Sequence, residues 1–128
     1  MINTENIKTF VQQTLGCGCP EEVFRSIDCQ SNIKLTDKIF GSKVYIGNKL
    51  LIYIMEVHNT DSLKDILPFL IDRGKKERDS LGLNRFRLVL ATDTVNEIKE
   101  VAEDIFKVLN KDEKIHLHIV SKKDIALL

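Results

Sequence analysis

Two cysteines separated by one glycine form the segment whose residue types and spacing are most typical of a metal-binding or reactive site. Cys17 and Cys19 lie between two expected helices, and Cys19 directly precedes Pro20 at the expected start of the second. Unpaired N–H groups and the helix dipole favour a thiolate there, whereas the carboxylates of Glu21 and Glu22 disfavour it. The pair therefore predicts a site for a zinc, copper or iron ion, a redox pair or a reactive thiol. A compact turn with two small, half-buried thiols is the alternative.

The third cysteine, Cys29, lies too far along the chain to complete a metal site with the other two. It follows Cys19 by ten residues, and a continuous helix would place the two about 15 Å apart. Zinc requires each sulfur within about 2.3 Å of the metal. Cys17 and Cys19 would therefore need further ligands, such as a histidine or a residue of a second subunit. Cys29 itself is expected to be a thiol without a role.

Two histidines alternate with apolar residues near the end of the chain. His116 and His118 share one face of an expected strand over Ile115–Val120, with their Cα atoms about 6.6 Å apart. That separation allows two imidazoles to bind one metal ion when further ligands are present. The alternation favours the other interpretation, in which the pair lies on the polar outer face of an edge strand.

Polar residues also follow the expected parallel strands, where open α/β sheets bind their ligands. Glu56 and His58 end one strand, Asp93 follows the next, and Lys122 follows the last. Together they could form an acid–base or metal site. Helix capping is the alternative role for Asp93 and its neighbours.

The composition excludes several classes of protein. The chain has 128 residues, 43% of them hydrophobic, and its 19 Lys and Arg balance 19 Asp and Glu. We expect one domain over residues 1–128, without a nucleic-acid partner, because there is no net positive charge and no tryptophan for base stacking. No apolar run reaches the length of a membrane span. The polar first residues and the odd number of cysteines predict a cytoplasmic protein with reduced thiols.

The hydrophobic pattern predicts an α/β fold, with α+β as the alternative. The expected helices cover Thr4–Leu15, Pro20–Asp28, a segment from Ser62 that contains Pro68 and Gly74, a segment from Thr94 to Leu109, and a turn from Ser121. The expected strands cover Asn32–Phe40, Lys43–Ile46, Lys49–Val57, Arg85–Ala91 and Ile115–Val120. Helices should pack on a single mixed sheet, in which an antiparallel hairpin turning at Gly47-Asn48 precedes a β-α-β-α-β unit.

Two charged runs are typical of solvated surface. The segment Asp72–Asp79, with Arg85 and Arg87 nearby, is locally basic but contains three acids. A solvated helix end is the expected reading, and a partner bearing phosphate is the alternative. The segment Lys111–Lys114 is expected to be a plain loop. The sequence contains neither a glycine-rich phosphate loop nor a Gly-x-Ser-x-Gly elbow.

The segment Thr14-Leu15-Gly16-Cys17-x-Cys19-Pro20-Glu21-Glu22-Val23-Phe24 resembles the opening of a small group of uncharacterised prokaryotic proteins. The resemblance covers about eleven residues. It implies a bacterial or archaeal cytosolic origin and carries no activity with it.

A second resemblance involves the middle of the chain. Three strands with Glu56 near the end of the third, followed by a helix and a strand, look like the core of PD-(D/E)XK nucleases. The resemblance implies that Glu56 would bind magnesium, but His58 stands where that family has its lysine. The preceding strand over Lys43–Ile46 carries no carboxylate, and Asp37 lies too early in the sequence to supply one to it. These departures put catalysis in doubt, and the likeness is kept as one of topology.

The sequence thus favours a small binding or regulatory domain over an enzyme. Its expected function is soft-metal binding or thiol redox sensing through Cys17 and Cys19. A degenerate nuclease-like or hydrolase site at Glu56 and His58 is one alternative. An interaction domain without chemistry, which could form homo-oligomers, is the other.

Overall fold

A computed structural model describes residues 4–16, 24–35, 40–47, 49–61, 63–109 and 111–126. The described elements follow one another along the chain as α1 (Thr4–Thr9), η1, a π-helical turn (Phe10–Thr14), β1 (Ile27–Lys34), β2 (Phe40–Ile46), β3 (Leu50–Glu56), α2 (Leu63–Ser80), β4 (Arg85–Thr92), α3 (Val95–Val108), β5 (Ile115–Ser121) and α4 (Lys122–Ile125).

The described strands form one five-stranded sheet in the order β1-β2-β3-β4-β5. The pairs β1–β2 and β2–β3 are antiparallel, whereas β3–β4 and β4–β5 are parallel. The hairpin turns at Gly47, whose φ of 56° is a conformation that glycine adopts readily, and Lys49 N–H donates to the Ile46 carbonyl at 3.0 Å. The prediction of a mixed sheet that begins with an antiparallel hairpin is therefore confirmed.

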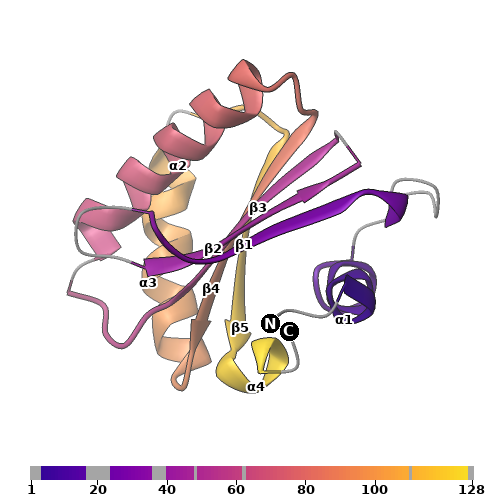
Figure 1. Cartoon of the computed structure of the whole chain (residues 1–128). Coiled ribbons are helices and arrows are strands. Elements are labelled where there is room, and N and C mark those ends of the chain that lie inside the picture. The colour runs from indigo at the N-terminus through magenta and orange to yellow at the C-terminus, as the bar shows by residue number, and fades with distance from the viewer. Residues whose placement is uncertain are drawn as a thin grey trace.

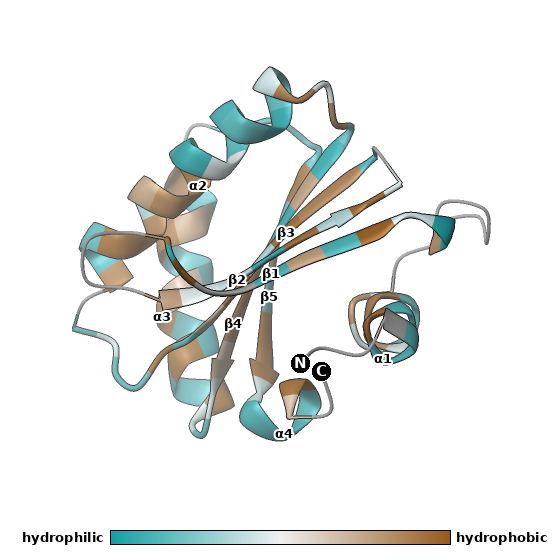
Figure 2. Ribbon diagram, in the orientation of Figure 1, coloured by the Kyte–Doolittle hydropathy of each residue, from teal (hydrophilic) through white to brown (hydrophobic). Residues whose placement is uncertain are grey.

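Helices cover both faces of the sheet. Figure 1 shows α2 and α3 side by side on one face, with α1 and α4 on the other. The central strand β3 is buried along its length up to Met55, as its double apolar pattern predicts. In Figure 2 the central strands are mainly hydrophobic, while the C-terminal half of α2 is mainly hydrophilic.

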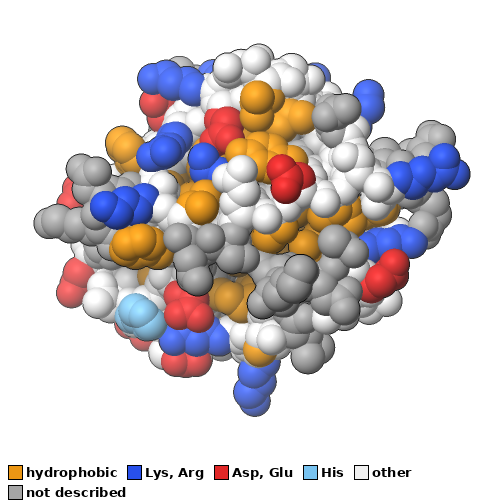
Figure 3. All heavy atoms as spheres, viewed as in Figure 1, with side chains coloured by type: hydrophobic (Ala, Val, Ile, Leu, Met, Phe, Trp, Pro, Cys, Tyr) orange, Lys and Arg blue, Asp and Glu red, His pale blue; other side chains and the backbone are white. Residues whose placement is uncertain are grey.

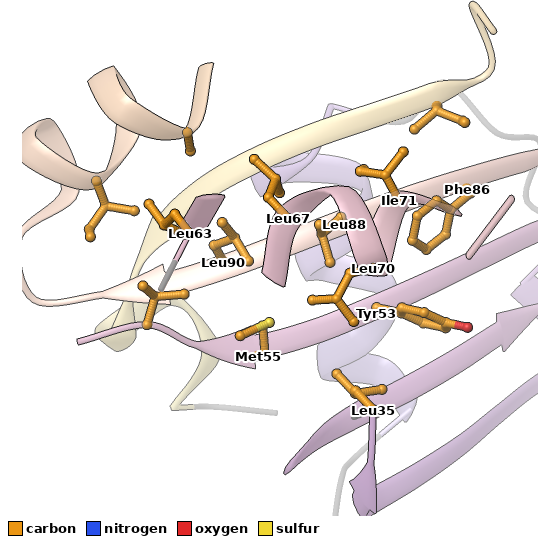
Figure 4. Close-up of a cluster of buried hydrophobic side chains, with 14 of the residues drawn as sticks. Leu35, Tyr53, Met55, Leu63, Leu67, Leu70, Ile71, Phe86, Leu88 and Leu90 are labelled. Atoms are coloured by element: carbon orange, nitrogen blue, oxygen red, sulfur yellow. The ribbon is translucent and has the colours of Figure 1, made fainter. Parts of the chain in front are cut away.

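The sheet separates two hydrophobic cores. The core under α2 and α3 includes Tyr53, Leu70 and Phe86, which lie close together in Figure 4. The core under α1 and η1 includes Phe10 and Ile52. Residues that alternate along β3 and β4 belong to opposite cores. Whether a residue of these strands faces α2 and α3 or faces α1 and η1 therefore depends on whether its position along the strand is odd or even.

Helix α2 contains both Pro68 and Gly74. It begins at Leu63, five residues before Pro68, so Pro68 does not mark its start. Gly74 is buried, and a Cβ there would overlap the ring of Phe86. Gly74 therefore lets α2 approach β4 closely, which compensates for its poor helix propensity.

The expected helix over Pro20–Asp28 is wrong at its C-terminal end. Ile27 and Asp28 belong to β1, where Ile27 pairs with Ile46, while residues 17–23 lie outside the described residues. The side chain of Ile27 packs against the core under α1. Cross-strand pairing outweighs the local helical pattern, because a few apolar residues fit either period.

The boundaries of the first two strands also differ from the prediction. β1 begins at Ile27 rather than at Asn32 and ends at Lys34, and Gly41 and Ser42 lie inside β2. Gly41 is opposite Met55, and a Cβ there would overlap the Ile54 carbonyl and the Leu35 side chain. This glycine permits close packing within a strand and does not mark a turn.

The two ends of the described chain follow their capping signals. Gly16 has a φ of 70°, as expected after the first helical segment. Ser121 and Asp124 form a complete capping box on α4. None of the described helices has the length and apolar character needed to cross a lipid bilayer.

Candidate functional site

Two arginines and two histidines form a cluster on the sheet face that carries α1 and η1. Arg85 and Arg87 alternate with core residues along β4, and His116 and His118 alternate in the same way along β5. Arg85 Nη1 lies 3.1 Å from His116 Nε2, and Arg87 Nη1 lies 2.7 Å from His118 Nε2. The parallel register, in which Arg87 pairs with His116, places the four side chains in two adjacent Arg–His pairs. We call these four residues the arginine–histidine cluster.

Arg87 is a buried cation that forms no ion pair with a carboxylate of the described residues. It is only 9% exposed, and its Nη1 also lies 3.4 Å from the Leu15 carbonyl at the end of η1. Its Nε–H is enclosed by protein atoms and has no hydrogen-bond partner. Among the described residues, no aspartate or glutamate forms an ion pair with Arg87 or Arg85. Burial, followed by the charge of Arg85, lowers the pKa of Arg87.

The two histidines are oriented as hydrogen-bond acceptors toward the arginines. A guanidinium has no acceptor atom, so Nε2 of each imidazole must accept, and the proton of the neutral ring then lies on Nδ1. Burial lowers the pKa of His118 to about 4, assisted by the charges of Arg87 and His116. The pKa of His116 is lowered by burial and then by Arg87 and Arg85. The cluster therefore presents N–H groups and positive charge, which favour an anion over a metal cation.

The predicted metal sites gain no complete set of ligands from the described part of the chain. Within that part, no three His, Cys, Asp or Glu side chains are grouped so that they could hold a metal ion. Cys17 and Cys19 lie outside the described residues, so the metal or redox site expected there stays a prediction. Cys29 is half-buried on β1 and packs against the core under α1.

The polar residues at the carboxyl edge of the parallel strands meet in part. Lys122 Nζ lies 3.3 Å from Asp93 Oδ2 and 3.4 Å from His58 Nδ1. Glu56 is exposed at the end of β3 and lines a pocket of about 330 Å³ together with Ser42 and other residues. The structure thus brings three of the four candidate residues together around Lys122, with Glu56 in the wall of a pocket. The alternative role of helix capping is seen at Ser121, whose side chain caps α4. The side chain of Thr94 makes no capping hydrogen bond to α3.

A second polar cluster, which the sequence analysis missed, lies between α2 and the antiparallel strands. Glu77 accepts hydrogen bonds from Lys43 Nζ at 2.9 Å, from Tyr45 Oη at 2.6 Å and from Tyr53 Oη. Burial alone would raise the pKa of Glu77, but these donors lower it below its ordinary value. Burial and the bond to Glu77 raise the pKa of both tyrosines. The cluster is internally satisfied and joins α2 to β2 and β3.

Arg78 shows that the expected solvated helix end is partly wrong. It is only 5% exposed, and its Nη1 and Nη2 donate to the two carboxylate oxygens of Asp112 at 2.9 and 2.6 Å. Asp79 accepts from Arg78 Nε and Nη2. The hydrogen bonds from Arg78 lower the pKa of Asp112 to about 2. Asp112, from the segment expected to be a plain loop, therefore anchors the approach to β5 to the end of α2.

The surface offers no broad field of one sign on the face seen in Figure 3, where acidic and basic side chains are interspersed. A charged ligand would accordingly be recognised at a local cluster. Comparisons of the chain with protein-family models, curated proteins and solved structures found no match.

Proposed function

We propose that the protein is a binding domain for an anionic ligand, and that the arginine–histidine cluster is its binding site. One observation carries this proposal: Arg87 is buried and has no counter-ion among the described residues. The two neutral imidazoles beside the arginines supply further N–H donors but no negative charge.

A buried guanidinium needs negative charge nearby. It stays protonated in proteins, so it cannot avoid the cost of burial by losing its proton. An uncompensated buried charge costs on the order of 3–5 kcal/mol, and an anion close to it removes much of that cost. Arg87 also has a structural contact, to the Leu15 carbonyl. At 3.4 Å this contact is long, and a neutral acceptor does not balance the charge.

Access to Arg87 defines how an anion would bind. Its Nε–H is enclosed, and its Nη1 contacts His118 and Leu15. Nη2 makes no hydrogen bond to the described residues, so the anion would contact Nη2 from the remaining exposed margin. The imidazole N–H groups and the exposed Arg85 would complete its surroundings. A planar guanidinium with several donors suits carboxylate and phosphate groups.

Calorimetric titration with inorganic phosphate tests the proposal, with chloride at matched ionic strength as the reference. We expect saturable binding, and a rise in Tm that follows the concentration of phosphate. Arg87→Met should abolish binding, and His118→Gln should weaken it several-fold, which keeps the test informative if Arg87→Met does not fold. Arg25→Met removes an exposed arginine outside the cluster and serves as the control. Equal responses to phosphate and chloride, or unchanged binding by both cluster variants, would refute the proposal.

A second candidate function is a hydrolase, or degenerate nuclease-like, site at the carboxyl edge. It is favoured by the contacts of Lys122 with Asp93 and His58 beside the pocket that Glu56 lines. The order of elements, three strands followed by a helix and another strand, is the one on which the resemblance rests. In this arrangement the His58 Nδ1 accepts from Lys122, so His58 would donate Nε2–H to a substrate oxyanion.

Binding of a divalent cation tests this second candidate. The hypothesis expects magnesium or manganese to bind in a titration, and the binding to disappear in Glu56→Ala. Glu97→Ala, on the exposed face of α3, is the matched control. A titration without binding would exclude a metal-dependent hydrolase at this edge and leave the anion-binding proposal untouched.

A further inference from the structure

The two Arg–His pairs of the cluster are arranged in a line along the strands. Arg85 and Arg87 are two residues apart on β4, as are His116 and His118 on β5. Equivalent positions two residues apart in a strand are about 6.6 Å apart. The two pairs therefore present two separate sets of donors along the strands.

The pairs also differ in burial. Arg87 is buried and contacts His118 at 2.7 Å, whereas Arg85 is exposed and contacts His116 at 3.1 Å. Arg85 begins β4, so the exposed pair lies toward the rim of the sheet and the buried pair lies toward its middle. A ligand that enters from the rim would meet the exposed pair first and the buried pair second.

We infer that the ligand is a small molecule with two anionic groups, one at each Arg–His pair; this inference rests on the anion-binding function proposed above. The group at Arg87 and His118 would be the more desolvated of the two, and the group at Arg85 and His116 would stay in contact with solvent. Phosphoryl and carboxylate groups share the required chemistry, since both accept charge-assisted hydrogen bonds from a guanidinium.

A small ligand fits the molecule better than a polyanion does. The chain has no net charge, and acidic side chains are interspersed with basic ones on the face seen in Figure 3. Binding of a nucleic-acid strand depends on many phosphate contacts and on aromatic side chains for stacking. The cluster offers two cationic pairs and contains no aromatic residue other than its imidazoles.

The test compares probes with one and with two anionic groups. Calorimetry would use inorganic phosphate, pyrophosphate, propane-1,3-diyl bisphosphate and glutarate. In pyrophosphate the two phosphoryl groups share one oxygen and are held close together, whereas the propane spacer separates them. We expect the spaced bisphosphate to bind at least about tenfold more tightly than phosphate, because a second charge-assisted contact is added. Glutarate separates a preference for carboxylate from one for phosphoryl groups.

Variants distinguish the inference of two anionic groups from the anion-binding function on which it rests. Arg85→Gln should lower the affinity for the spaced bisphosphate about tenfold and the affinity for phosphate much less. Lys99→Gln removes one positive charge from α3, on the opposite face of the sheet, and is the control for net charge. No binding of any probe would refute the anion-binding function itself. Equal affinities for phosphate and the spaced bisphosphate would refute only the two-group inference.

An oligonucleotide tests whether the ligand is a polyanion rather than a small molecule. Single-stranded oligothymidylate is expected to bind more weakly than the spaced bisphosphate at the same ionic strength. Tighter binding, with a salt dependence that requires more than two phosphate contacts, would overturn the inference of a small ligand.

Discussion

Arg78 and Arg87 are two buried arginines of one small protein with opposite electrostatic surroundings. Arg78 is 5% exposed and is held by Asp112 and Asp79, which raise its pKa. Arg87 is 9% exposed, has no carboxylate among the described residues and has a lowered pKa. Arg78 is therefore balanced by two carboxylates of the described residues, whereas Arg87 is balanced by none of them. This difference is the reason why the anion site is proposed at Arg87.

Glu77 supports the same distinction with the opposite sign of charge. Its negative charge is balanced by Lys43, and its carboxylate accepts hydrogen bonds from the hydroxyl groups of Tyr45 and Tyr53. The fold thus satisfies its buried charges where their role is structural. Among the described residues the arginine–histidine cluster departs from this pattern, which supports the anion site proposed there.

The largest expected effect comes from applying one substitution to both arginines. Arg78→Met should lower the free energy of unfolding by about 2–3 kcal/mol, because it removes charge-assisted hydrogen bonds to two carboxylates. Arg87→Met should not lower it and is expected to raise it in the absence of added anion, because an unpaired buried charge is replaced by an apolar chain. Urea unfolding in chloride measures both values. Equal losses in the two variants would mean that Arg87 has a counter-ion in the chain.

The pH dependence of stability offers a second contrast, centred on His118. The unfolded chain binds a proton at the ordinary histidine pKa of 6.5, whereas folded His118, which faces Arg87 and His116, does so at about 4. Protonation therefore favours unfolding, and this contribution lowers stability as the pH falls from about 6.5 to about 4. We expect a loss on the order of 2 kcal/mol that is absent in His118→Gln. Parallel pH profiles of the two proteins would contradict the half-buried, cation-flanked position of His118.

Protonation of Asp112 should lower the free energy of unfolding at lower pH than protonation of His118 does, and by a smaller amount. Its pKa falls from 3.8 to about 2 in the folded protein, so its carboxylate stabilises the fold above about pH 4 and ceases to do so near pH 2. Because its side chain is 37% exposed, we expect a contribution of about 1 kcal/mol. Urea unfolding at pH 4.5 and 2.5 should show a smaller difference in Asp112→Asn than in wild type. Asp104→Asn, on the exposed face of α3, is the control and should behave as wild type does.

The smallest effect is expected from the acids that follow the first two cysteines in the sequence, Glu21 and Glu22, which lie outside the described residues. If neither carboxylate is the counter-ion of Arg87, the double variant Glu21→Gln/Glu22→Gln should change the free energy of unfolding by less than about 0.5 kcal/mol. Its affinity for phosphate should stay within about twofold of wild type. A destabilised double variant that binds phosphate more tightly would show that one of these carboxylates is the counter-ion of Arg87.

The sequence predicts most of the fold because strands and helices leave distinct hydrophobic periods. The continuous apolar run Leu50–Met55 identifies β3, the alternation in Ile115–Val120 identifies β5, and the spacing after Thr94 identifies α3. The prediction fails around Ile27 and Gly41. The first lies in a short apolar segment that suits either period, and the second is a glycine whose reason, the nearby Ile54 carbonyl, is remote in sequence.

The candidate site is only half visible in the sequence. Alternation alone indicates that His116 and His118 share a face, and the same alternation is present at Arg85 and Arg87. That these pairs face one another depends on the parallel register of β4 and β5, which residue types do not specify. The absence of a carboxylate beside Arg87 among the described residues is a property of packing. It could not be predicted from a chain with equal numbers of acidic and basic residues.

One spectrum can test the central claim on both arginines at once. The side-chain Nε–H groups of Arg78 and Arg87 can be followed by ¹H–¹⁵N NMR while phosphate is added at constant ionic strength, with assignments from Arg78→Lys and Arg87→Lys. We predict that the Arg87 signal shifts along a saturable curve while the Arg78 signal, held by Asp79 and Asp112, stays in place. An unmoved Arg87 signal, or equal and non-saturating shifts of both, would contradict the assignment of an anion site at Arg87.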